Sequence, residues 1–225
     1  MVLKRLFDLV FSISALIIFA PLFLLVGISI KIASPGPILF KAIRAGKNGK
    51  PFSLLKFRTM HQGSESGSAI TAICDQRVFG FGSFLRKTKI DELPQFFNVL
   101  TGDMSVVGPR PEAQDIVTYY YDELGYQTLS VRPGIASPGS LFNYTHAHQY
   151  LKDDPEMDYV HKFLPIKLAI EKVYIDNADF WQDLQVIYRT FHTIVQIAMG
   201  KVNFPYPSEY LIAMDQGLID KNLMK

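Results

Sequence analysis

The first thirty residues carry the strongest hydrophobic pattern of the chain. From Leu9 to Ile30, LVFSISALIIFAPLFLLVGISI, 22 residues follow one another without a charged side chain. As an α-helix this run would measure about 33 Å, enough to cross a hydrocarbon core of roughly 30 Å. A cleaved signal peptide fits poorly, because its apolar part rarely exceeds about 15 residues. The pattern therefore predicts a membrane helix, with a long buried helix of a soluble protein as the alternative.

Pro21 lies in the middle of this run. A proline there removes one backbone hydrogen bond and clashes with the carbonyl four residues back, so we expect a kink near Ala20 and Pro21. Positively charged residues flank the run on both sides, at positions 4, 5, 31, 41, 44, 47 and 50. Because Lys and Arg favour the cytoplasmic side of a membrane, the flanks favour a re-entrant helix over a spanning one.

Shorter patterns organise the rest of the chain. Two strand-like runs, 38–44 and 52–59, flank the turn Gly46-Lys47-Asn48-Gly49 and predict a β-hairpin. The polar stretch His61–Ser68 predicts a mobile loop. Chain breaks are expected at Arg132-Pro133-Gly134 and at Ser137-Pro138-Gly139. The predicted helices are 83–87, 92–100, 111–124, 159–175 and 179–199.

The last predicted helix has an apolar stripe at three- and four-residue spacing. Its members are Phe180, Trp181, Leu184, Ile187, Tyr188, Phe191, Ile194 and Val195. Such a stripe is usually part of a core. Trp and Tyr beside a membrane anchor also suit docking at the membrane interface, and the sequence leaves both interpretations open.

Charge is distributed unevenly along the 225 residues. Residues 1–60 hold nine Lys or Arg against the single acid Asp8, whereas the remainder holds fourteen basic and twenty acidic side chains. A basic first quarter indicates a negatively charged partner, either a nucleic acid or an anionic membrane surface. Since the basic residues flank a membrane segment and no nucleic-acid motif is present, we expect no nucleic-acid partner. The single Cys74 excludes an internal disulfide.

Several cations stand in stiff or crowded settings. Arg110 lies between two prolines, and Arg132 precedes Pro133-Gly134. Planar guanidinium groups suit bidentate binding of phosphate oxygens. With Lys56, Arg58 and Arg86 they predict a polyanionic ligand, although each one alone is better explained as a salt-bridge partner of the acidic body.

Asp91 and Glu92 form the most prominent acidic pair. Thr88 and Asp91 have the spacing of a helix capping box, which gives Asp91 a structural interpretation. Adjacent helical residues point about 100° apart, so the two acids are expected to have different roles, one attacking and the other holding a metal or moving a proton. His146 and His148 alternate, but two histidines without a third ligand are a weak metal signal.

Six segments extend this picture: KRLFDLVFS, SPGPILF, GKNGKPFSLLKFRTM, FLRKTKIDELPQFFNVLTGDMSVVGPRPE, VRPGI and EKVYIDNADFWQDL. Together they resemble the bacterial sugar transferases, the small monotopic phosphoglycosyl transferases, from about residue 4 to residue 195. The resemblance implies an α+β monotopic membrane protein. Residues 1–33 would form a proline-broken re-entrant helix. Residues 34–225 would form a cytosolic catalytic part with a small β-hairpin and mostly helices, some lying on the membrane surface.

The resemblance also implies an activity. Such enzymes move a sugar-1-phosphate from a UDP-sugar to polyprenol phosphate, typically undecaprenyl phosphate, and release UMP at the cytoplasmic face of the bacterial inner membrane. Asp91 would be the nucleophile of a covalent phosphosugar intermediate, with Mg²⁺ held by Asp91 and Glu92. Pro21 would be the helix break. Arg110 would bind phosphate, joined in our prediction by Lys56, Arg58, Arg86 and Arg132.

The sequence departs from the family pattern at three places. Ala20 replaces the usual serine before the membrane proline, Ala42 replaces a glutamine, and Ala136-Ser137 replaces Thr-Gly. Two other functions stay open at this point: a glycosyltransferase that moves only the sugar and releases UDP, and a membrane-anchored scaffold without activity. The sequence specifies neither the sugar nor whether the chain forms a homo-oligomer.

Overall fold

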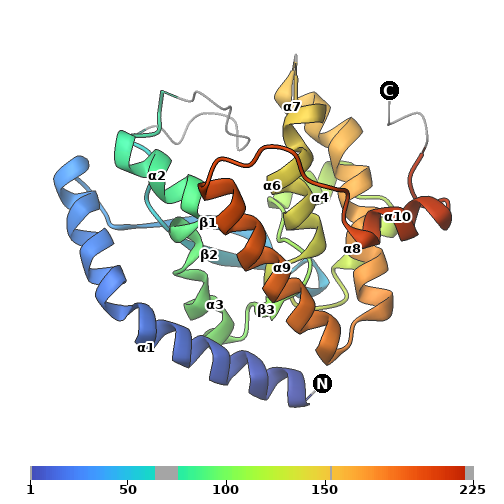
Figure 1. Cartoon of the computed structure of the whole chain (residues 1–225), viewed down its shortest axis with the longest axis horizontal. Helices are drawn as coiled ribbons and strands as arrows, with labels where there is room; N and C mark the ends of the chain where they lie inside the picture. Colours follow the sequence, from blue (N-terminus) through green and yellow to red (C-terminus); the bar gives the residue numbers. More distant parts are fainter. Residues whose placement is uncertain (1, 64–75, 153, 221–225) are drawn as a thin grey trace.

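The computed structural model describes residues 2–63, 76–152 and 154–220. α1 (Val2–Ala33) is a continuous helix that contains Pro21. It runs beneath the body of the molecule, bends near its middle and then rises along one side (Figure 1). Such a bend is what a proline inside a helix produces. Within the described residues, α1 is the one helix long and apolar enough to cross a membrane.

The beginning of α1 is bonded to the body by charged side chains. Arg5 donates to the carbonyl oxygens of Val99 and Leu100 at 2.7 and 3.1 Å. Asp8 is buried and accepts from the Ser105 hydroxyl at 2.9 Å. These polar contacts fix the first turns of α1 against the body.

The predicted hairpin is confirmed. β1 (Leu39–Ala45) pairs antiparallel with β2 (Pro51–Phe57) through the short helical turn η1 (Lys47–Gly49). Asn48 and Gly49 have φ of 57° and 73° in this turn, which Asn and Gly tolerate best. Residues 64–68 of the predicted mobile loop lie outside the described residues, as does Cys74.

Helices make up most of the remainder. In chain order they are α2 (Gly80–Thr88), the short 3₁₀ turn η2 (Ile90–Glu92), α3 (Gln95–Thr101), α4 (Gln114–Tyr120), α5 (Glu123–Thr128), α6 (Pro138–Tyr150), α7 (Pro155–Asp158), the π-helical turn η3 (Tyr159–Phe163), α8 (Leu164–Asn177), α9 (Phe180–Ala198) and α10 (Ser208–Asp215). The single helix predicted over 111–124 is wrong. It is divided because Asp122 caps α5 by accepting from the Gly125 backbone N–H.

α6 was not predicted, because Ser137-Pro138-Gly139 looked like a chain break. In the structure these residues start a helix instead. The Ser137 hydroxyl accepts from the Ser140 backbone N–H at 2.8 Å, and Pro138 occupies the first turn, where a missing N–H costs nothing. α6 and α10 both pack against α8. Buried residues of these helices make up most of the largest core cluster.

A small parallel sheet joins two arginine-containing loops. β3 (Ser105–Val107) pairs with β4 (Gly134–Ala136). The loops beyond them approach so closely that a Cβ on Gly134 would lie 2.0 Å from the Gly108 backbone nitrogen. Only glycine allows this contact, which places the Gly108–Pro111 loop beside Pro133.

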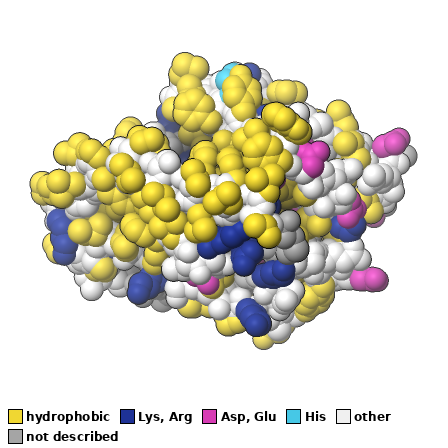
Figure 2. Space-filling view, turned by 90° about the horizontal axis from the view of Figure 1, so that it is seen from below, with side chains coloured by type: hydrophobic (Ala, Val, Ile, Leu, Met, Phe, Trp, Pro, Cys, Tyr) yellow, Lys and Arg dark blue, Asp and Glu magenta, His cyan; other side chains and the backbone are white. Residues whose placement is uncertain are grey.

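The apolar stripe of α9 is mostly exposed, so its interpretation as core is wrong. Trp181, Tyr188 and Phe191 are 70%, 68% and 68% exposed, whereas Val186 on the opposite side is buried. α1 is similarly apolar on its outer surface. Seen from the side on which α1 lies, apolar side chains cover a broad area, with Lys and Arg along one border (Figure 2). This surface is suited to an apolar environment.

Candidate active site

Asp91 and Glu92 lie in η2, between α2 and α3, and both side chains are buried, with 6% and 5% exposed. The capping-box interpretation of Thr88 is wrong. Thr88 ends α2, and its hydroxyl donates back to the carbonyl of Phe84 at 2.8 Å. The acid pair therefore stands in a tight turn rather than at the start of a long helix.

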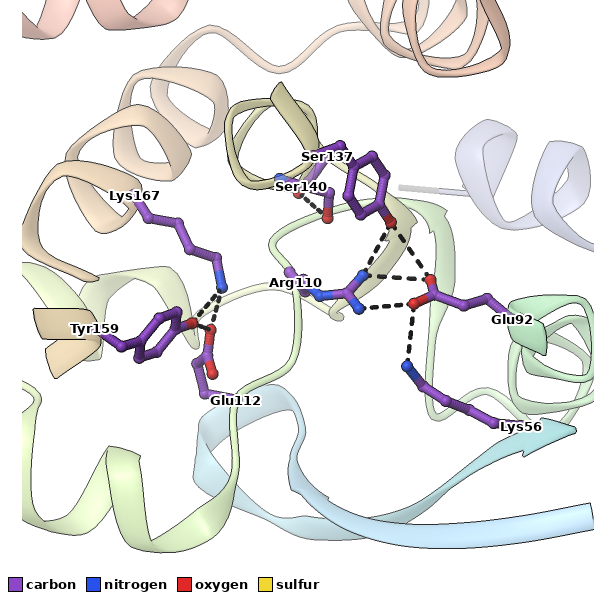
Figure 3. A network of polar contacts seen from close by, with 9 residues as sticks. Lys56, Glu92, Arg110, Glu112, Ser137, Ser140, Tyr159 and Lys167 are labelled. Carbon is purple, nitrogen blue, oxygen red and sulfur yellow. Dashed lines mark hydrogen bonds and ion pairs between the residues drawn. The ribbon is translucent and has the colours of Figure 1, made fainter. Parts of the chain in front are cut away.

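Glu92 is fully paired. Arg110 donates to both carboxylate oxygens, at 2.7 and 3.3 Å, and Lys56 donates to one of them at 3.0 Å (Figure 3). Burial alone would raise the pKa of Glu92, but the charges of Arg110 and Lys56 hold it well below its ordinary value. Glu92 is thus an ionised carboxylate with its charge compensated.

Asp91 is in a different state. Its Oδ1 atom is buried and has no hydrogen-bond partner among the described residues. Burial raises the pKa of Asp91, against the charge of Lys56, and the neighbouring charge of Glu92 raises it further. A buried carboxylate oxygen without a partner is costly unless a ligand or metal completes it. The adjacent acids therefore have different environments, as expected for different roles.

The loop that carries Arg110 is bonded to α8 and η3. The Arg110 backbone N–H donates to Glu171 on α8 at 3.1 Å, and the same oxygen of Glu171 accepts from Ser137 at 2.7 Å. Two residues on, Glu112 is buried against Lys167 and accepts from Tyr159 at 2.6 Å (Figure 3). Arg110 is thereby presented to the site with little freedom to lose.

Glu171 also holds the start of α6 against the arginine loop. A Cβ on Gly139 would lie 2.4 Å from its Oε1, so any larger residue there would force the Glu171 side chain to move. Burial raises the pKa of Glu171 to about 7, against the opposing charge of Lys167. Its second oxygen has no partner among the described residues.

Two further residues complete the site, and sequence reasoning missed both. The hydroxyl of Tyr144 on α6 lies 3.2 Å from Arg110 and 3.5 Å from Glu92. The ammonium of Lys89 lies 3.8 Å from the centre of the Tyr144 ring. Burial lowers the pKa of Lys89 to about 8. Tyr144 lies far beyond Asp91 in the sequence, in a helix that was not predicted, so no local signal pointed to it.

Of the remaining predicted cations, Arg86 lies near the acid pair and Arg58 does not. Arg86 lies close enough for its charge to act on Asp91, and its Nε donates to Thr59 at 2.8 Å. Arg58 is buried elsewhere, where it donates to the carbonyls of Pro37 at 2.6 Å and Ser34 at 2.5 Å. The structure thus brings Lys56, Arg86 and Arg110 around the acid pair and uses Arg58 to hold the backbone beyond α1.

Arg132 is exposed, and its Nε donates to the Gly102 carbonyl at 2.8 Å. Among the described residues no hydrogen bond or ion pair joins it to Asp91 or Glu92. Its sequence setting resembled that of Arg110, but its side chain is directed to the far end of α3.

The donors present fit a magnesium ion that is shared with a substrate. In the described part of the chain no three His, Cys, Asp or Glu side chains converge on one point. Mg²⁺ is commonly held by one or two carboxylates together with substrate phosphates, and the unpaired Oδ1 of Asp91 is a suitable donor. His146 is otherwise engaged: its ring stacks on Tyr206 and hydrogen-bonds Thr145 at 2.7 Å.

Comparison with known proteins gives this geometry a family. The sequence profile of the bacterial sugar transferases matches residues 1–197. The chain belongs to this family. The match includes α1, the acid pair, the arginine loop and nearly all of α9, so every element that builds the site lies within it.

Individual members of the family are similar over most of this chain. A UDP-N-acetylgalactosamine-undecaprenyl-phosphate N-acetylgalactosaminephosphotransferase of Aeromonas hydrophila is 37% identical over 86% of this chain and 44% of its own length. A UDP-glucose:undecaprenyl-phosphate glucose-1-phosphate transferase of Caulobacter vibrioides is 36% identical over 85% of this chain and 69% of its own. The exopolysaccharide production protein PSS of Rhizobium leguminosarum is 36% identical over 89% of this chain and 98% of its own length. The chain thus spans less than half of the Aeromonas transferase but almost all of the Rhizobium protein.

Proposed function

We propose that the chain transfers a sugar-1-phosphate from a UDP-sugar to polyprenol phosphate and releases UMP. The observation that supports this most is the buried, unpaired Oδ1 of Asp91 in a site where the charges of Lys56, Lys89 and Arg86 act on it. Family membership adds the reaction type, because the Aeromonas and Caulobacter relatives bear the names of undecaprenyl-phosphate sugar phosphotransferases.

The proposed reaction has two displacements at phosphorus. An oxygen of Asp91 attacks the β-phosphorus of the UDP-sugar, the bond from that phosphorus to the bridging oxygen breaks, and UMP leaves with the bonding electrons. A phosphate oxygen of the polyprenol carrier then attacks the same phosphorus. The bond to Asp91 breaks, which regenerates the carboxylate and yields a diphosphate-linked lipid.

The cations of the site would act throughout both steps. Arg110 and Lys56, already fixed on Glu92, supply positive potential where phosphate charge develops, without reorganising. Glu92 would act mainly by holding these two side chains. A magnesium ion on Asp91 and Glu92 would neutralise charge on the phosphate oxygens.

We further propose that α1 is re-entrant, with both termini and the site on the cytoplasmic side of the bacterial inner membrane. The bend of α1 and its exposed apolar side chains support this arrangement (Figures 1 and 2). It also leaves Lys4 and Lys31, near the two ends of α1, on the same side. Cysteine labelling in intact cells provides the test. Single cysteines near residues 2 and 220 of a variant that lacks Cys74 should both resist an impermeant reagent, and labelling of either one would contradict re-entry.

The activity is tested by the nucleotide product. The protein in detergent is incubated with undecaprenyl phosphate, Mg²⁺ and one UDP-sugar at a time, and nucleotides are separated chromatographically. The panel contains UDP-glucose and UDP-N-acetylgalactosamine, because the names of the relatives divide between these sugars. We expect UMP with at least one sugar and none after addition of EDTA. Release of UDP would indicate transfer of the sugar alone and would refute the proposal.

A further inference from the structure

Lys89 differs from the other half-buried cations around the acid pair. Lys56 and Arg110 are paired with Glu92, and Arg58 is bound to backbone carbonyls. In the part of the chain that the structure describes, no hydrogen bond or ion pair engages the ammonium of Lys89, which lies over the ring face of Tyr144. An ammonium in an environment that burial has partly dehydrated requires a partner.

The backbone of Lys89 is in a conformation that lysine disfavours. Its φ of 59° and ψ of 14° are left-handed, at the position after α2 where glycine or asparagine is usual. Among the described residues other than glycine, only Asn48 shares a positive φ. Such strain at a non-glycine residue is typical of functional sites, where the side chain serves a purpose other than stability.

The charges around Lys89 identify the kind of ligand. Four cations, Lys56, Arg86, Lys89 and Arg110, act on the two carboxylates of Asp91 and Glu92. Glu92 is compensated by Arg110 and Lys56, and the Lys89 ammonium is near enough to both Glu92 and Asp91 for its charge to act on them. Each phosphate of a nucleotide-sugar diphosphate carries a negative charge, so an oxygen of this ligand would give the Lys89 ammonium an anionic partner.

We propose that Lys89 binds an anionic oxygen of the diphosphate of the nucleotide-sugar substrate. Its left-handed backbone places the ammonium over Tyr144, so that the ring holds the cation until the diphosphate arrives. The proposal rests on the proposed function for the identity of the substrate. It makes Lys89 a substrate-binding residue in addition to the arginine and lysine that hold Glu92.

Lys89→Gly tests this, because it removes the ammonium and relieves the backbone at once. We expect KM for the UDP-sugar to rise about tenfold to a hundredfold, as for loss of a charge-assisted hydrogen bond. The Tm should be unchanged or higher, since glycine accepts the left-handed conformation. Asn48→Gly is the matched control: it makes the same backbone change in the hairpin turn, and KM and Tm should stay at the wild-type values.

Direct binding separates this proposal from the proposed function. Affinity for UDP, measured by calorimetry with Mg²⁺, should fall about tenfold in Lys89→Gly whether or not the wild-type protein releases UMP. Lys89→Asn, which also tolerates a positive φ, replaces the glycine variant if that one does not fold. Unchanged KM and UDP affinity would overturn the proposal. So would a lower Tm with unchanged UDP affinity, because Lys89 would then serve the fold.

Discussion

Asp91→Asn is expected to reduce transfer of sugar-1-phosphate by about a thousandfold or more, the scale on which loss of a covalent nucleophile acts. The asparagine amide has the same shape as the carboxylate but does not attack phosphorus. Because burial of the Asp91 charge is unfavourable, the Tm of the variant should equal or exceed that of the wild-type protein. Loss of activity without loss of stability would separate a chemical role from a structural one.

Mass spectrometry supplies the second measurement. Wild-type protein with a UDP-sugar and Mg²⁺, but without lipid acceptor, should gain the mass of a sugar phosphate on Asp91, and Asp91→Asn should not. Asp103→Asn is the matched control, because Asp103 is an acid outside the site that accepts from the Thr101 hydroxyl at 2.7 Å. Full turnover by Asp91→Asn would contradict the covalent step, and a wild-type protein without any turnover would favour a scaffold.

Arg110→Met is expected to lower the free energy of unfolding by about 3 kcal/mol, because it removes the bidentate cationic partner of the buried Glu92. In a chain of this size that corresponds to a fall in Tm of about 6–12 °C. Transfer activity should also fall at least a hundredfold, since Arg110 faces the phosphates in the proposed reaction.

A double-mutant cycle with Glu92→Gln isolates the pair. Because the second change removes the uncompensated charge, the double variant should regain much of the lost stability but none of the activity. Arg132→Met serves as the control for stability, since the Arg132 side chain is exposed and makes one backbone hydrogen bond. An equal loss of Tm in the Arg132 and Arg110 variants would show that the ion pair of Glu92 is not what stabilises this region.

Local chemistry made part of this fold predictable. The β1–β2 hairpin could be predicted from the turn residues Asn48 and Gly49, because the two strands that pair are adjacent in the sequence. The long apolar α1 and the helix with the aromatic stripe could likewise be predicted from spacing alone. What spacing did not indicate for α9 was which environment the stripe faces, because an amphipathic face looks the same whether protein or lipid covers it.

The site was predictable only in part. The acid pair and the constrained Arg110 stand out in the sequence. Tyr144 and Glu171 acquire their roles from the packing of α6 and α8, and the left-handed backbone of Lys89 is not indicated by its neighbours in sequence. Arg58 was predicted to bind phosphate because it belongs to the basic region of the sequence. In the structure its guanidinium donates to backbone carbonyl oxygens instead. Which partner an arginine meets is decided by tertiary contacts that a single sequence does not display.

The bonds of Arg5 and Asp8 have a practical consequence for preparing this protein. They make the start of α1 a structural support for α3 and β3. Removal of the first ten residues would leave the carbonyls of Val99 and Leu100 and the hydroxyl of Ser105 without these partners, at the end of the helix that follows the acid pair. Water-soluble versions are therefore better obtained by replacing the exposed apolar side chains of α1 than by deleting the helix.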